Sequence, residues 1–176
     1  MTRSTTFKAS IFAGLLAAFG TSAHAADLTV GANIGNVPWE FEDASGKVTG
    51  FEVDLVNEIA KRLGKTVEFV NTPFNGLFPA VQSGRINMAI SSITITEKRL
   101  ESVSFAQPYY DSDQSLTALA EGPKSLAEMK DKVVGVDTGS TGDMWATENT
   151  AKYGFAEIRR FEGLAPAMLD LGNGRI

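Results

Sequence analysis

The sequence predicts an α/β fold with a mostly parallel sheet. Short apolar segments alternate with amphipathic ones, turn residues separate them, and 43% of the 176 residues are hydrophobic, which is enough for a packed core. The clearest strand is residues 28–32, where the side chains alternate in character. The clearest helix is residues 51–63, where apolar residues recur at helical spacing and Gly64 follows as a stop signal.

The first half of the chain continues this alternation. Residues 39–42 alternate before a turn signal at 43–47, which predicts a small hairpin. Asn75 is expected to be the N-cap of a helix over 76–83. Thr94 and Glu97 fit a capping box for a helix that runs to about Glu101. Further strands are predicted at residues 66–70 and 86–92.

The second half follows the same rules. Strands are predicted at residues 102–105, 116–120, 133–136 and 156–161, and helices at 126–129, 143–153 and 166–171. The chain ends on Gly174-Arg175-Ile176, which repeats the Gly84-Arg85-Ile86 that leads into an earlier strand. We therefore expect the chain to be truncated at the start of a strand.

Residues 1–25 have the three regions of a secretory signal peptide. Arg3 and Lys8 are basic, residues 9–20 are apolar, and Ala23-His24-Ala25 is a small-x-small cleavage site. We expect cleavage after Ala25 and export of the remaining chain.

Composition excludes several classes of protein. The chain has no Cys, and its one His, His24, lies in the expected leader, so disulfide scaffolds, thiolate metal sites and Ser-His-Asp hydrolases are excluded. There are 16 Lys and Arg against 21 Asp and Glu, a balance that disfavours nucleic acid as a partner. We expect no metal and no other cofactor.

Two loops between a strand and a helix could hold an anion. In the loop 91–99, helix N–H groups, hydroxyls and Arg99 could converge on a carboxylate. Spacing alone favours the alternative, in which Thr94 and Glu97 only cap a helix and Arg99 is a solvated charge. The loop 137–142 forms a second set of free amides, or simply a helix cap. Asp54 and Glu58 lie opposite the apolar stripe of their helix and are expected to be a solvated face rather than an acid/base pair.

Several stretches match one family in order. They are Pro38-Trp39-Glu40-Phe41, residues 50–55, residues 59–64, residues 74–80, residues 83–87, residues 95–99 and residues 105–110. The chain resembles the family 3 solute-binding proteins, the periplasmic polar amino-acid receptors of ABC importers, from about Leu28 to its end. The resemblance implies a periplasmic-binding-protein-like type II fold, in which two α/β lobes are joined by a two-strand hinge. It implies a first lobe at residues 26–113 and an incomplete second lobe at 114–176, after the signal peptide 1–25.

The resemblance also implies a ligand site. The expected ligand-binding residues are Asn33, Asn36, Phe74, Ser92, Ile93, Thr94, Arg99, Asp137, Ser140 and Thr141. The first-lobe residues from 92 to 99 match those that hold the α-carboxylate and part of the α-ammonium, with Ile93 acting through its backbone, and this favours a binding role for Arg99. Ser140 and Thr141 match second-lobe amides that reach the same carboxylate.

The remaining positions are expected to contact the ligand's side chain. Phe74 matches a residue that packs on it, and Asp137 lies where a second-lobe residue can touch it. Asn33 occupies a position that often carries an acid in receptors for basic ligands. Asn36 occupies a position that is often aromatic, so the usual stacking platform is missing.

The function that follows from the resemblance is non-enzymatic. We expect capture of a polar amino acid in the periplasm and its delivery to the membrane permease of an ABC importer. Two alternatives remain open: an enzyme similar to prephenate or arogenate dehydratases, which resemble this family, and the sensing domain of a membrane receptor.

Overall fold

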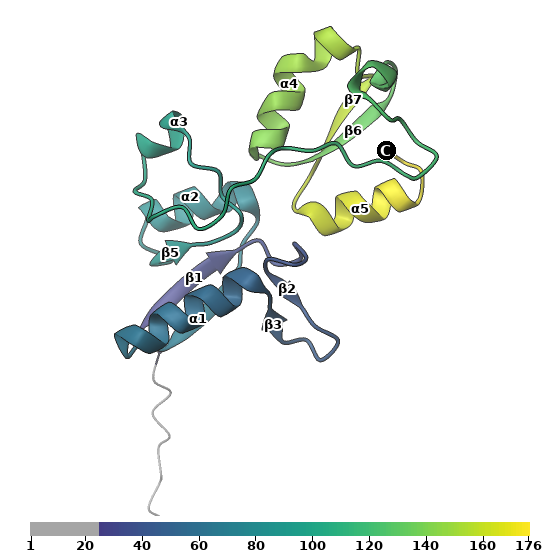
Figure 1. Cartoon of the computed structure of the whole chain (residues 1–176). Coiled ribbons are helices and arrows are strands. Elements are labelled where there is room, and N and C mark those ends of the chain that lie inside the picture. The colour runs from purple at the N-terminus through teal and green to yellow at the C-terminus, as the bar shows by residue number, and fades with distance from the viewer. Residues whose placement is uncertain (1–24) are drawn as a thin grey trace, which may run out of the picture.

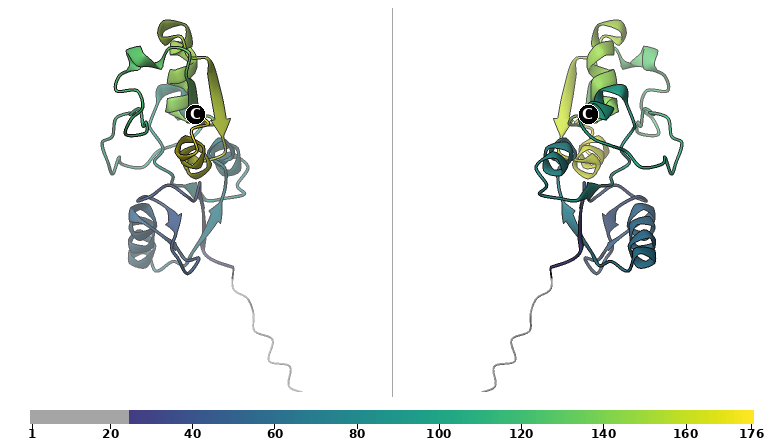
Figure 2. Two further views of the ribbon diagram at one scale, coloured as in Figure 1. Left: turned by 90° about the vertical axis from the view of Figure 1, so that its right-hand side faces the viewer. Right: turned by 90° about the vertical axis from the view of Figure 1, so that its left-hand side faces the viewer.

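The structure is a computed structural model that describes residues 25–176. All but the last residue of the expected signal peptide lie outside this range. Figure 1 shows the described elements in two groups, one above the other, joined by an extended segment. The two side views in Figure 2 show the same stacking, with α5 at the boundary between the groups.

The lower group is built on a parallel sheet of order β4-β1-β5, formed by β4 (Val67–Asn71), β1 (Leu28–Ala32) and β5 (Met88–Ala89). In the register, Leu28 lies opposite Val67 and Val30 lies opposite Met88. Helices α1 (Phe51–Leu63), α2 (Phe74–Gln82) and α3 (Glu97–Leu100) belong to this group, as does the hairpin of β2 (Phe41–Glu42) and β3 (Val48–Thr49).

The packing of α2 against the sheet depends on a small residue in the central strand. A Cβ at Gly31 would lie 2.4 Å from Ile86 Cδ1 and 3.0 Å from Leu77 Cδ2. Glycine therefore lets the helix and the chain after it approach β1 closely. Leu77 is fully buried, and with Phe74, Ala80 and Ile86 it forms the core of this group.

The upper group contains a second parallel pair, β6 (Val133–Asp137) and β7 (Glu157–Phe161). Helices α4 (Thr141–Tyr153) and α5 (Leu164–Gly172) pack against both strands, and the 3₁₀ helix η1 (Leu126–Met129) packs against α4. A separate core of Met129, Val136, Ala146 and Phe155 fills this group.

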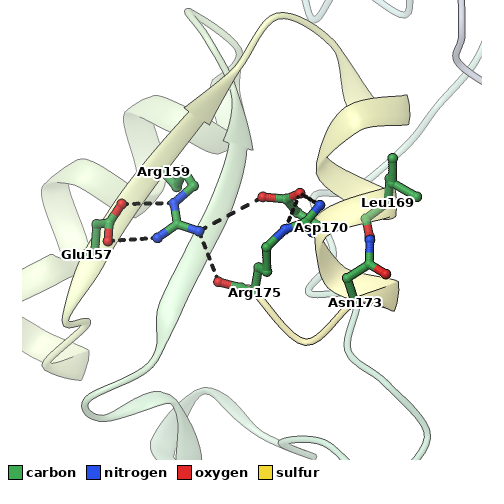
Figure 3. Close-up of polar contacts among 6 residues, drawn as sticks. All are labelled: Glu157, Arg159, Leu169, Asp170, Asn173 and Arg175. Carbon is green, nitrogen blue, oxygen red and sulfur yellow. Dashed lines mark hydrogen bonds and ion pairs between the residues drawn. The ribbon is translucent and has the colours of Figure 1, made fainter.

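Charged side chains hold the end of the described chain against β7. Figure 3 shows that Arg159 lies between Glu157 and Asp170, with Nε 3.0 Å from a Glu157 carboxylate oxygen. Its Nη1 donates to the backbone carbonyl of Arg175 at 3.0 Å, and Arg175 in turn pairs with Asp170. These groups are at least partly exposed, so each pair adds little stability.

Four local expectations are wrong. The segment 102–119 forms no strand, because no other described segment hydrogen-bonds with it as a ladder, so the strands expected at 102–105 and 116–120 are absent. Asn75 does not cap α2; Pro73 holds the N-cap position and Asn75 is already helical. Thr96, not Thr94, caps α3, and its hydroxyl accepts from the Arg99 N–H.

Other boundaries differ only in length. The strand expected at 86–92 is confined to Met88–Ala89, and α4 and α5 each begin two residues before the expected starts at 143 and 166. Within residues 25–176, no helix combines the length and apolar composition needed to cross a membrane.

Candidate functional site

A cavity of about 150 Å³ lies between the two groups of elements. The residues that line it are Asn33, Asn36, Glu40, Phe74, Ser91, Ser92, Thr94, Gln114, Asp137, Ser140, Thr141 and Leu164. Several of them end or follow β1, β5 and β6, and the carboxyl ends of parallel strands are where α/β proteins bind ligands. Eight of the ten expected site residues line the cavity; Ile93 and Arg99 do not.

Arg99 lies behind the cavity wall and joins the two groups. Only 8% of the residue is exposed, so the alternative of a solvated surface charge is wrong. Its Nη1 donates to the Thr94 carbonyl at 2.7 Å, and its Nη2 donates to the Gly139 carbonyl at 3.2 Å. The guanidinium also lies 5.3 Å from the ring centre of Phe74, which supports a cation–π contact.

The charge of Arg99 has no described counter-ion. Burial lowers the pKa of the guanidinium, which still remains protonated because an arginine pKa lies far above neutrality. Among residues 25–176, no carboxylate forms an ion pair with it. The two side-chain hydrogen bonds use two of the five guanidinium N–H groups, so this buried cation can still hold an anion.

The N-terminus of α4 supplies the opposite wall. The Ser140 hydroxyl accepts from the Asp143 N–H at 3.1 Å, and the Asp143 carboxylate accepts from the Gly139 N–H at 3.0 Å. Burial opposes ionisation of Asp143, but the Gly139 N–H and the Arg160 guanidinium hold its pKa below the ordinary value. Thr141 is the first residue of α4, so its own N–H has no acceptor within the helix and is free for an anion.

Two polar contacts cross the cavity near this helix. Thr94 Oγ1 and Thr141 Oγ1 lie 3.3 Å apart, and Gln114 Nε2 donates to the same Thr141 hydroxyl at 2.8 Å. The carboxylate-binding residues expected from each lobe are therefore neighbours in space, although they lie more than forty residues apart in the chain.

A second part of the cavity carries unpartnered polar atoms. Asn33 and Asp137 are 8% and 9% exposed, and Asn33 Nδ2 and Asp137 Oδ1 have no hydrogen-bond partner. Both side chains flank Gly163: a Cβ there would lie 2.9 Å from Asn33 Oδ1, and the Gly163 N–H bonds to Asp137. Burial raises the pKa of Asp137 to about 6, against the opposing effect of the Gly163 and Thr138 N–H groups.

Four cavity residues were not expected from the sequence. Ser91 lies in the loop that the sequence singled out, and Glu40 lies in a matched motif, so both had a local signal. Gln114 and Leu164 had no local signal in the sequence, because neither lies in a predicted binding loop. They reach the cavity from the extended crossing segment and from the start of α5. Within the described part of the chain, no three His, Cys, Asp or Glu residues gather into a group that could hold a metal ion.

Two α/β units that meet at a polar cavity define a two-lobed ligand-binding protein of the type II periplasmic-binding fold. The sequence profile of the bacterial extracellular solute-binding proteins, family 3, matches residues 28–160. The chain belongs to this family.

Individual relatives give the same result. The histidine-binding periplasmic protein of Salmonella typhimurium is 32% identical over 151 residues, which cover 85% of this chain and 58% of that protein. A solved ancestral arginine-binding protein bound to arginine has a TM-score of 0.74 and 34% identity, over 85% of this chain and 66% of that one. A solved ancestral amino acid-binding protein, described as a precursor of cyclohexadienyl dehydratase, has a TM-score of 0.74 and 37% identity, over 84% and 67%.

These relatives are described as binding proteins, in keeping with the non-enzymatic function expected for this chain. The chain spans 58% of the length of the histidine-binding relative.

Proposed function

We propose that the protein binds an amino acid with a cationic side chain in the cavity between its lobes, in the periplasm, and delivers it to the membrane permease of an ABC importer. The single observation that carries the choice of ligand is the buried Asp137 carboxyl, whose Oδ1 has no partner and whose residue lines the cavity. The names of relatives that bind histidine or arginine support the same class of ligand.

The ligand's carboxylate fits the region between Arg99 and the start of α4. Arg99 is a buried cation with no described carboxylate partner, and the first amides of α4 point out of a helix N-terminus. Hydrogen bonds to charged groups contribute about 1.5–3 kcal/mol each. Micromolar binding needs only about −8 kcal/mol, so a few such contacts with side-chain packing are sufficient.

The ligand's side chain fits the region around Gly163. The Asp137 carboxylate can accept from a guanidinium, ammonium or imidazolium group, and a cation placed there offsets the cost of burying the ionised carboxyl. Asn33 adds a polar amide beside the same glycine. Phe74 lines the cavity and can pack against the aliphatic part of the side chain.

Calorimetric titration of the chain with arginine, histidine, lysine, glutamine and glutamate tests the proposal. We expect the three basic amino acids to bind at least about tenfold more tightly than glutamate, since a tenfold ratio is only about 1.4 kcal/mol. Asp137→Asn should remove most of this preference and leave glutamine binding nearly unchanged. Asp54→Asn, on the exposed face of α1, is the matched control. An unaltered preference in Asp137→Asn would contradict the proposal.

A further inference from the structure

Two glutamates lie fully buried behind the loop that follows β5. Glu40 immediately precedes β2, Glu52 is in the first turn of α1, and both are 0% exposed. Neither forms an ion pair with a lysine or arginine among the described residues. Two ionised carboxylates buried together without a cation would be strongly destabilising.

The hydrogen bonds around the pair satisfy one oxygen of each carboxyl. Glu52 Oε1 accepts from the Ser92 N–H at 2.8 Å, from the Ser92 hydroxyl at 3.1 Å and from the Tyr109 hydroxyl. Glu40 Oε1 accepts from the Ser91 hydroxyl at 2.7 Å. The other two oxygens, Glu40 Oε2 and Glu52 Oε2, are buried and have no donor.

We propose that Glu40 keeps a proton on Oε2 at neutral pH and donates it to Glu52 Oε2, so that the pair carries one negative charge and fixes Ser91 and Ser92 at the cavity. One shared proton satisfies both orphaned oxygens. The charge belongs on Glu52, because three donors, one of them a backbone N–H, converge on a single oxygen of it, whereas only the Ser91 hydroxyl and the Asn36 amide reach Glu40.

The electrostatics of the cluster agree with this assignment. The pKa of Glu40 is raised to about 9, mainly by burial and secondly by the neighbouring Glu52. Burial also raises the pKa of the Tyr109 hydroxyl, which therefore stays neutral and keeps donating to Glu52. The other groups that face the pair are Ser91, Ser92 and Asn36, none of which titrates near neutrality.

The pair acts on the cavity through the two serines. The Ser91 hydroxyl donates to Glu40 and accepts from the Asn33 N–H at 3.1 Å. The Ser92 hydroxyl donates to Glu52 and accepts from Asn36 Nδ2 at 3.2 Å. Ser92 has a φ of 48°, in the left-handed region that a serine adopts only when its surroundings enforce it. Glu40 and Glu52 are thus positioning residues, and their effect on binding rests on the proposed function.

The charge state can be measured without any ligand. At about pH 8 Asp137 is largely ionised, and we expect the infrared spectrum of the folded protein to show a neutral carboxylic acid carbonyl band that disappears as the pH rises through about 9. Glu40→Gln should lack the band. A folded wild-type protein without the band would overturn the proposal, even if the variant failed to fold.

Electrophoretic mobility gives an independent measure of charge. Glu40→Gln should leave the mobility of the native protein unchanged at about pH 7.5, because it replaces a neutral group. Glu42→Gln, an exposed residue of the same hairpin, is the matched control and should shift the mobility by one charge. An equal shift in both variants would show that Glu40 is ionised and would overturn the proposal.

Stability has a defined pH trend under this assignment. A carboxyl whose pKa is raised on folding binds its proton more tightly in the folded state, so its stabilising effect is full below the unfolded value of about 4.5 and is lost as the pH rises to about 9. The Tm of the wild type relative to that of Glu40→Gln should fall across this window and then level off. A constant difference would contradict the inference.

Ligand binding tests the positioning role separately. Between about pH 8 and pH 10, the arginine affinity of the wild type should fall more than that of Glu40→Gln, because only the wild type ionises Glu40 in this range. The ligand's own amine also loses its proton there, but this affects both proteins equally. Equal losses would overturn the positioning role. If arginine did not bind at all, the proposed function would fail, and the infrared and mobility measurements would still decide the proton on Glu40.

Discussion

Arg99 is a buried, positively charged side chain that contacts both lobes. Its side chain bonds the Thr94 carbonyl on one side and the Gly139 carbonyl on the other, in a fork that uses two separate nitrogens. A lysine has one ammonium on a flexible stem and cannot reproduce two fixed directions while also meeting a carboxylate. The geometry of the guanidinium, rather than its charge alone, therefore matters at this position.

Arg99→Lys is expected to weaken amino-acid binding by about tenfold or more, which is at least about 1.4 kcal/mol. The variant keeps the charge and loses the planar donor set. Titration calorimetry with arginine measures the change. Arg85→Lys, at an exposed position, is the matched control and should bind like the wild type. Unchanged affinity of Arg99→Lys would show that the guanidinium does not hold the ligand.

The role of a single residue could be predicted from the sequence where the residue belongs to a motif. It could not be predicted where the role depends on contacts between distant segments. The spacing of Thr94 and Glu97 fits an exposed helix cap as well as a binding loop, so only the resemblance pointed to a binding role for Arg99. Glu40 and Glu52 each lie in a matched stretch, but nothing in the sequence pointed to their pairing, because a hairpin brings the two side chains together. The burial of Asp137 had no signal in the sequence either, because it depends on the fold, which also brings the Gly163 N–H to this carboxyl.

At the scale of the element, the cap of the short helix α3 and the cavity contact beside it come from two different threonines. Thr96 caps it, with its hydroxyl accepting from the Arg99 N–H at 3.3 Å. Thr94 lies two residues earlier, lines the cavity and contacts Thr141 across it. The two threonines are close in sequence and differ in role.

Thr96→Ala is expected to lower the free energy of unfolding by about 1 kcal/mol, because it leaves a helix N–H without its cap. Thr94→Ala should have a smaller effect on stability and a larger effect on ligand affinity. Urea unfolding and calorimetric titration of both variants measure the two quantities. If Thr94→Ala were the less stable protein, Thr94 rather than Thr96 would be the helix cap, as the spacing of Thr94 and Glu97 predicts.

Elements with their own periodicity and stop signals were predicted well. The bounds of β1 and α1 match the expected 28–32 and 51–63, because an amphipathic stripe and a left-handed Gly64 define the helix without outside help. The strands expected at 102–105 and 116–120 failed for the converse reason. A strand needs a hydrogen-bonded neighbour, and the described chain supplies none for this segment.

At the scale of the whole molecule, two separate cores meet through polar contacts. One core surrounds Leu77 and the other surrounds Val136. The contacts between the lobes include the hydrogen bond from Arg99 to Gly139 and the contact between the Thr94 and Thr141 hydroxyls. The sequence predicted two lobes and a hinge between them through its resemblance to a family, and the folded chain shows that an extended segment at 102–119 makes the connection. The boundary between residues 113 and 114 stays a prediction.

Separate cores joined by only a few polar contacts should not unfold as one cooperative unit. The chain has two tryptophans, and each reports on one lobe: Trp39 packs edge-on against Phe51 at 5.6 Å, and Trp145 stacks on Tyr153 at 5.7 Å. Urea unfolding followed by fluorescence in Trp145→Phe reads the first lobe, and in Trp39→Phe it reads the second. We expect two different midpoints without ligand.

A ligand held by both lobes stabilises only the state in which both are folded. Saturating arginine should therefore raise the lower midpoint more than the higher one and bring the two transitions together, which rests on the proposed binding function. Glutamate at the same concentration is the control and should leave the midpoints apart. Coincident transitions in the ligand-free protein would show that the polar contacts at Arg99 and Thr141 couple the lobes more strongly than their small number implies.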